Sequence, residues 1–113
     1  VYKRQLIDSA KDYVHRNYRS VDLGLDDTCK ELGVSNSYFS SLFKKETGSS
    51  FVEYLTDYRM DKAARMLVET DDKSYVIAQN VGYADPNYFS YVFKRKYGVS
   101  PSRYRTEYEK NKV

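Results

Sequence analysis

An internal repeat limits what this chain can fold into more than any other feature of its sequence. Gly33 and Gly82 each follow a short helical pattern, and each precedes a longer pattern with aromatic residues, basic residues near its end and a final glycine. The residue types keep the same order in both copies, with one extra residue after Gly82. The matched residues are Cys29 and Ala78, Tyr38-Phe39-Ser40 and Tyr88-Phe89-Ser90, Phe43-Lys44 and Phe93-Lys94, Gly48 and Gly98, and Tyr54 and Tyr104. We therefore expect two copies of one small helical unit.

Length and composition fit such a fold. With 113 residues the chain has room for one domain, or for two small subdomains that share a connection. Hydrophobic residues make up 41%, charged residues 31%, and there are only five glycines and two prolines, which is typical of helical proteins. No apolar run approaches the roughly 20 residues of a membrane span, and the first residues lack a signal-peptide pattern. We expect an all-α protein in the cytoplasm.

The chain offers little for catalysis or metal binding. Cys29 is the single cysteine and His15 the single histidine, which excludes an internal disulfide and a conventional zinc site. A nucleophilic pair of these two side chains is conceivable, but nothing in the sequence brings them together. A buried Cys29 and a surface His15 are the better interpretation, so we expect no enzymatic activity, no metal and no cofactor.

Local signals place the helices. Apolar residues recur at helical spacing over residues 4–16, which predicts an amphipathic helix. Residues 25–32 and 36–47 predict two more helices, each ended by a glycine suited to the left-handed C-cap conformation. In the second copy, Asp85 is a predicted N-cap and Pro86 a predicted first helical residue, which starts a helix over residues 86–97.

The longest helical pattern, residues 51–68, changes its apolar side part of the way along. At about 100° per residue, one apolar set lies roughly opposite the other. The first set is Phe51, Tyr54, Leu55 and Tyr58, and the second is Met60, Ala63, Ala64 and Leu67. Charged residues, among them Arg59, argue against a helix buried on all sides. We predict a first helix-turn-helix subdomain at 1–50, a linker helix at 51–68 and a second helix-turn-helix subdomain at 69–113.

Each repeat meets the requirements of a DNA-binding helix-turn-helix. That motif needs a small residue where two helices cross, a turn with glycine, and a second helix with one apolar and one polar face. Such a recognition helix points its first polar residues at base edges, and basic residues near its end can reach phosphates. The predicted base readers are Ser37, Ser40 and Ser41 in the first copy, and Asn87, Ser90 and Tyr91 in the second. Asn36 completes the first polar face, and the predicted phosphate contacts are Lys44, Lys45, Lys94 and Arg95.

Asn87 is the most informative of these residues, because its amide can bond adenine N6 and N7 together. The charge distribution agrees with a polyanionic partner. From Lys94 to Lys112 there are seven basic residues against two acidic ones, a local excess of five, although the whole chain carries only +3.

Other interpretations explain part of the pattern. The phenylalanines at helical spacing, Phe39, Phe43, Phe89 and Phe93, are expected in the core, whereas Tyr38 and Tyr88 beside the predicted readers remain open. Thirteen tyrosines would allow base stacking on single-stranded nucleic acid, but they fall mostly at core spacing. A protein-interaction module that kept the fold without DNA binding is the remaining alternative.

The repeat also carries a recognisable signature. The second copy holds Ile77-Ala78, Gly82-Tyr83, Asp85, Tyr88-Phe89-Ser90, Phe93-Lys94, Gly98, Ser100-Pro101 and Tyr104-Arg105, and Arg59, Ala63 and residues 43–48 fit as well. With these residues, nearly the whole chain resembles the DNA-binding domain of the AraC/XylS family of bacterial transcription regulators. The resemblance implies about seven helices, in two helix-turn-helix units that are joined by a long helix and enter successive major grooves of double-stranded DNA.

The resemblance also implies a covalently attached N-terminal sensor or receiver domain. Residues 43–48 and 85–95 are similar to family members that follow a response-regulator receiver. The chain departs from the family where Ser41 and Tyr91 stand in place of a frequent arginine, and where Cys29 stands in place of alanine. Loss of both arginines removes the commonest guanine contact, so a different base preference is expected, with more contact from Tyr91 to the thymine methyl group.

Overall fold

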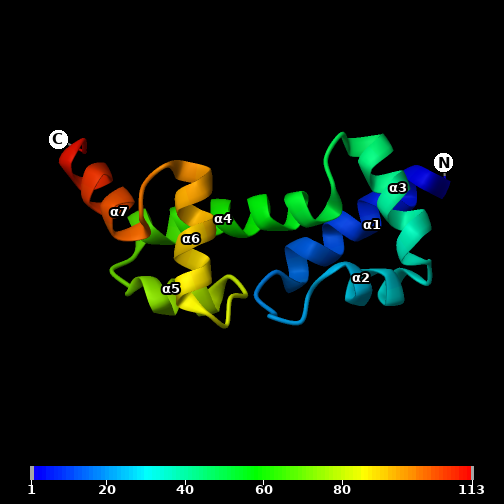
Figure 1. Ribbon diagram of the computed structural model, residues 1–113, viewed down its shortest axis with the longest axis horizontal. Coiled ribbons are helices and arrows are strands. Elements are labelled where there is room, and N and C mark those ends of the chain that lie inside the picture. Colours follow the sequence, from blue (N-terminus) through cyan, green and yellow to red (C-terminus); the bar gives the residue numbers. More distant parts are fainter. Residues whose placement is uncertain (1, 113) are drawn as a thin grey trace. The chain divides into compact units, whose positions relative to one another are not determined.

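Seven α-helices make up the computed structural model, which describes residues 2–112. They are α1 (Tyr2–Asn17), α2 (Leu25–Leu32), α3 (Asn36–Thr47), α4 (Phe51–Glu69), α5 (Ser74–Asn80), α6 (Pro86–Tyr97) and α7 (Pro101–Lys110) (Figure 1). This confirms the all-α, seven-helix prediction. The first helix is longer than the apolar spacing predicted, because good helix formers, Lys3, Arg4 and Gln5, precede its first buried residue. No helix within residues 2–112 is long and apolar enough to cross a membrane.

The turn between the paired helices has the same hydrogen bond in both copies. Gly33 takes the left-handed conformation with φ of 71°, and Gly82 has φ of 93°. The next residue donates its N–H back over the turn: Val34 to the carbonyl of Cys29 at 3.1 Å, and Tyr83 to that of Ala78 at 2.9 Å. A side chain at either glycine would strain this backbone. The repeat seen in the sequence is therefore a repeat of backbone geometry.

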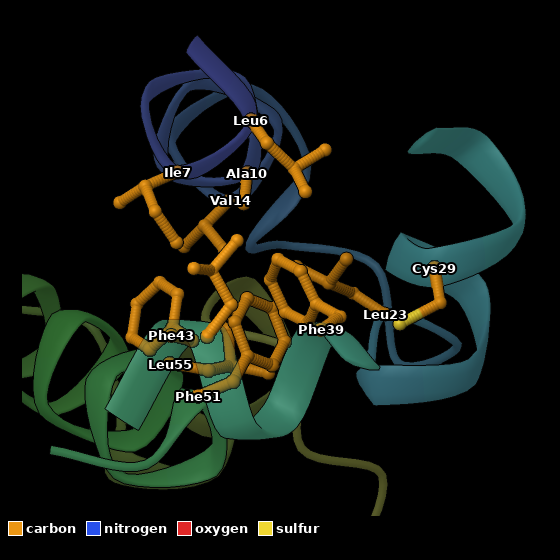
Figure 2. Packing of buried hydrophobic residues seen from close by; sticks show 11 residues of the cluster. Leu6, Ile7, Ala10, Val14, Leu23, Cys29, Phe39, Phe43, Phe51 and Leu55 are labelled. Carbon is orange, nitrogen blue, oxygen red and sulfur yellow. The ribbon is translucent and has the colours of Figure 1, made fainter. Parts of the chain in front are cut away.

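The described chain forms two compact units that divide between Tyr58 and Arg59. In the first unit, α1 packs on α2 and α3. Its core contains Leu6, Ile7, Ala10, Val14, Leu23, Cys29, Phe39, Leu42, Phe43, Phe51 and Leu55. Figure 2 shows side chains of α1 facing the phenyl rings of α3. The ring of Phe51 meets the rings of Phe39 and Phe43 edge-on, with centroids 5.4 and 5.5 Å apart.

In the second unit, α6 packs on α5 and α7. Phe89 and Phe93 of α6 are fully buried, as predicted, and the ring of Tyr104 in α7 meets Phe93 edge-on at 5.4 Å. The guanidinium of Arg105 donates hydrogen bonds to the carbonyls of Leu67, Thr70 and Asp72. These bonds fasten α7 to the end of α4 and to the turn that leads into α5.

Helix α4 contributes to both units (Figure 1). Phe51 and Leu55 belong to the core of the first unit, whereas Met60, Ala63 and Leu67 are buried in the part that belongs to the second. The predicted change of apolar side is confirmed.

The burial of Arg59 corrects the sequence interpretation, which counted this residue among the charges that argue against burial. Its side chain is only 8% exposed, and its guanidinium lies 5.5 Å from the centroid of the Tyr83 ring. Burial lowers the pKa of Arg59 below its ordinary value, while the electrostatic interaction and hydrogen bond with the Tyr83 hydroxyl oppose that shift. Arginine tolerates such a site because the aromatic face and the hydrogen bond replace part of its hydration.

Candidate nucleic-acid interface

The first recognition helix, α3, is fixed at its start by two side chains. The hydroxyl of Ser35, in extended conformation, accepts a hydrogen bond from the N–H of Tyr38 at 3.2 Å and so caps the N-terminus of the helix. The amide of Asn36 donates to the carboxylate of Asp26 in the first turn of α2. Asn36 thus ties α3 to α2, a role that the sequence interpretation of a plain polar face did not include.

The side of α3 away from the core presents most of the other predicted readers. Ser37 and Ser41 are exposed, Ser40 is half-buried, and the ammonium-bearing side chains of Lys44 and Lys45 follow in the last turns. The described residues contain no acidic side chain in an ion pair with either lysine. The structure therefore brings these five residues onto one solvent-facing side of the helix.

Lys3 of α1 is a residue that sequence reasoning missed. It lines a shallow hollow beside α3, together with Ser37, Tyr38, Ser41, Leu42 and Lys45. Nothing in the local pattern around Lys3 marks it as part of an interface, because only the packing of α1 on α3 brings it there. The hollow adds a third lysine to the exposed side of α3.

The second recognition helix, α6, starts as the sequence predicted. The carboxylate of Asp85 accepts a hydrogen bond from the N–H of Asn87 at 2.9 Å, and Pro86 is the first helical residue. An acidic cap also suits the positive end of the helix dipole. The side chain of Asn87 is exposed, and Ser90 is half-buried like Ser40 at the matching position of α3. Asn87 thus lies in the first turn of α6, where base edges are read in helix-turn-helix proteins.

An aromatic strip along α6 has no counterpart in the serine-rich side of α3. Tyr88 and Tyr91 are each 56% exposed, and their rings stack with centroids 6.2 Å apart. The Tyr91 hydroxyl accepts a hydrogen bond from Nη1 of Arg95 at 3.1 Å, and the guanidinium lies 5.8 Å from the ring centroid. This hydrogen bond raises the pKa of Arg95 above its ordinary value. Arg95 is thus bonded to Tyr91 while it remains exposed to solvent.

Three more basic residues of the segment from Lys94 to Lys112 are bonded to protein groups. Lys96 donates to the carboxylate of Asp61 at 2.8 Å, and Arg103 pairs with Glu107 at 3.2 Å. Arg105 bonds three backbone carbonyls, as described above. Lys94 is exposed, and the structure gives it no acidic partner within residues 2–112. The excess of positive charge read from the sequence is therefore less available to a polyanion than the count suggested.

Two capped recognition helices, each following the same glycine turn, define a DNA-binding helix-turn-helix protein. The family profile described as a helix-turn-helix domain matches residues 28–107. The chain belongs to the AraC family of these DNA-binding domains. It is a transcription-regulator domain and not an enzyme.

Relatives and solved structures agree with this assignment. The lactose operon transcription activator of Staphylococcus xylosus is 36% identical over 80 residues, which cover 71% of this chain and 28% of that protein. The C-terminal domain of AraT, a response regulator from Geobacillus stearothermophilus, is 39% identical with a TM-score of 0.89, and the match covers 90% of this chain and 84% of that one.

A further match is the C-terminal domain of the two-component response regulator yesN from Fusobacterium nucleatum. It is 35% identical, with a TM-score of 0.85, and the match covers 93% of this chain and 99% of that one. The chain spans between 10% and 31% of the length of the curated relatives compared with it. The likeness therefore concerns their DNA-binding part.

Proposed function

We propose that this domain binds specific double-stranded DNA sites as a two-part reader, with α3 and α6 in successive major grooves. The proposal rests on the backbone structure that the two copies share. Each has the same turn hydrogen bond, a capped recognition helix, buried phenylalanines on one side and exposed polar side chains on the other. A monomer could then contact two boxes about one helical turn apart, roughly 34 Å.

In this proposal the polar and basic side chains on the outer sides of α3 and α6 divide by chemistry. Hydroxyls and the Asn87 amide at the first turns contact base edges, and the lysines at the helix ends contact phosphates. The base-contacting residues are Ser37, Ser40, Ser41, Asn87, Ser90 and Tyr91, and the phosphate contacts are Lys44, Lys45 and Lys94. Lys3 adds a phosphate contact beside α3, whereas Asn36 acts mainly by holding α3 against α2.

We propose that the longer protein to which this domain belongs carries a sensor or receiver domain N-terminal to it. Two similar solved structures are C-terminal domains of response regulators, which favours a receiver. Relatives in Staphylococcus xylosus and Bacillus subtilis are named as activators, which favours activation as the outcome of binding. The proposed location is the bacterial cytoplasm, where the DNA is.

Selection from a random duplex library with this chain tests the proposal, followed by fluorescence anisotropy on the enriched site at two salt concentrations. We expect two short boxes about 10 base pairs apart, and an affinity that falls steeply as salt rises. Lys94→Ala should weaken binding to every sequence and reduce the salt slope by about one. A single enriched box would contradict the two-part reading. If the chain binds a polyanionic matrix such as heparin and duplex DNA does not compete with that binding, a protein partner would be favoured instead.

A further inference from the structure

We infer that Arg95 reads a guanine in the major groove and that Tyr91 is the residue that positions it. The inference rests on the proposed insertion of α6 into the groove, and it gives Arg95 a role other than the phosphate contact expected from the sequence. It starts from the hydrogen bond between Nη1 of Arg95 and the Tyr91 hydroxyl, 3.1 Å long, on the exposed side of α6.

Helix geometry brings the guanidinium toward the reading end. Side chains on an α-helix lean toward its N-terminus, so residue 95 covers the surface near residue 91, one turn earlier. The distance of 5.8 Å between the Arg95 guanidinium and the Tyr91 ring agrees with this lean. Arg95 therefore presents its charge near the predicted reader Tyr91, whereas a phosphate contact would extend outward from the end of the helix.

The chemistry of the pair suits guanine. A guanidinium has five N–H donors, and the bond to Tyr91 uses one of them. The remaining donors allow two parallel bonds to guanine O6 and N7, the commonest specific contact of arginine with DNA. Because the side chain is already ordered by Tyr91, binding costs less conformational entropy than it would for a free arginine.

Helix α3 has no pair equivalent to Tyr91 and Arg95. Lys45 occupies the position that matches Arg95, and Ser41 the position that matches Tyr91. An ammonium is a point charge without the planar fork of a guanidinium, and no hydrogen bond joins Ser41 and Lys45 within the described residues. Guanine preference of this origin is therefore expected only in the box that α6 reads.

The pair also accounts for a departure from the family resemblance. Where the family resemblance implies a frequent arginine, this chain has Tyr91, which has no guanidinium to bond guanine. Arg95 restores a guanidinium at nearly the same height of the helix, from one turn further along. Tyr91 then acts on DNA in two ways, by its own ring and through Arg95.

The test compares variants on the site selected with the parent chain. Arg95→Lys keeps the charge and loses the fork, and Tyr91→Phe keeps the ring and loses the hydroxyl. Tyr88→Phe is the matched control, because its hydroxyl is not the one that Arg95 bonds. Circular dichroism checks that each variant is folded. Anisotropy gives the base preference from sites that carry guanine, each other base, or 7-deazaguanine, which lacks N7, at the tested position. A salt series on the same sites gives the contribution of phosphate contacts.

We expect Arg95→Lys to lose about 5- to 150-fold of its preference for guanine, the equivalent of about 1–3 kcal/mol, with an unchanged salt slope. Tyr91→Phe should lose part of that preference, and Tyr88→Phe none of it. The 7-deazaguanine site should weaken binding of the parent more than binding of Arg95→Lys, because a lysine can donate at most a weaker, unforked contact to N7.

Two results would overturn the inference while leaving the proposed function intact. One is an α6 box without a preferred guanine. The other concerns a further variant, Arg95→Ala, measured on the same sites. Equal weakening of all sequences by this variant, with a reduced salt slope, would make Arg95 a phosphate contact. Failure to enrich any site would instead overturn the proposed function, and this inference with it.

Discussion

The pair α2–α3 and the pair α5–α6 share a frame and differ in what surrounds it. In the first pair, α3 carries exposed serines, and Asn36 is bonded to Asp26 of the preceding helix. In the second, α6 carries an aromatic strip that ends in Arg95. The backbone turn and the buried phenylalanines are the same in both. The repeat therefore conserves the scaffold, and the surfaces that it presents have diverged.

The two units also close their cores differently. The first unit uses α1, a helix of 16 residues, whose apolar side covers α3. The second uses the shorter α7, and Arg105 fastens it to backbone carbonyls at the end of α4. One core is covered by a long apolar helix and the other by a short helix with a polar fastening. The predictions below test how much each of these two arrangements contributes to stability.

The largest expected effect comes from the matched phenylalanines. Phe43→Ala and Phe93→Ala each remove a fully buried ring, and each should cost about 3–5 kcal/mol of unfolding free energy. Native-state hydrogen exchange should locate the loss. Protection should fall mainly in α2 and α3 for Phe43→Ala, and mainly in α5 and α6 for Phe93→Ala. Equal loss throughout the chain in both variants would mean that the two units unfold as one.

Arg105 should contribute more to the free energy of unfolding than its place near the C-terminus suggests. Arg105→Ala removes a charged donor from three carbonyls, and we expect a loss of about 2–3 kcal/mol, since hydrogen bonds to charged groups are among the stronger ones. Arg103→Ala is the matched control. It breaks only an exposed pair with Glu107, and should cost about 0.5 kcal/mol or less. Urea unfolding measures both, and similar losses would show that the carbonyl fastening contributes little.

The sequence predicted the features that local signals encode. Helix α6 begins at Pro86 because Asp85 and Pro86 form a start signal within a few residues, and α2 ends at Leu32 because the next residue, Gly33, readily takes a positive φ. The repeat predicted which phenylalanines are buried. Each of these inferences needs only neighbouring residues or a periodic pattern.

Features that depend on distant partners were not predictable in this way. The burial of Arg59 needs Tyr83, which lies 24 positions later in the sequence, and the role of Arg105 needs carbonyls more than 30 positions earlier. Asn36 and Arg95 were read as polar and basic surface, yet each has a specific protein partner. Charge and polarity indicate that a side chain will seek a partner, and only the fold determines which one.

Asn87 and Ser37 occupy matching positions, so they compare the readers of the two helices directly. Asn87→Ala should cost about 1–3 kcal/mol at one preferred base pair and relax the preference there, because an amide can form two bonds with adenine. Ser37→Ala removes a single hydroxyl and should cost less, about 1 kcal/mol. Anisotropy with single-base variants of the selected site measures both. If Asn87→Ala binds every site as the parent does, Asn87 is not a base reader.

The smallest effect is a pH dependence found in the second unit. The carboxylate of Asp61 in α4 accepts hydrogen bonds from Lys96 at 2.8 Å and from Tyr97 at 3.0 Å. Desolvation raises the pKa of Asp61, but these hydrogen bonds and the charge of Lys96 lower it by more, so the pKa lies below its ordinary value. At the matching positions of α3, Glu46 and Thr47 cannot form an equivalent pair of bonds with a carboxylate.

A depressed pKa in the folded state means that ionised Asp61 stabilises the fold above the unfolded pKa of about 4, and that this stabilisation is lost as the pH falls through the folded value. Because the Asp61 side chain is 69% exposed, solvent screening keeps the effect below about 1 kcal/mol. Asp61→Asn should therefore be slightly less stable than the parent near neutral pH, and the difference should shrink as the pH falls below about 4 and at high salt. Urea unfolding near neutral pH and in acid tests this. A difference that persists in acid would assign the effect to packing, and the fastening of α6 to α4 would then not depend on charge.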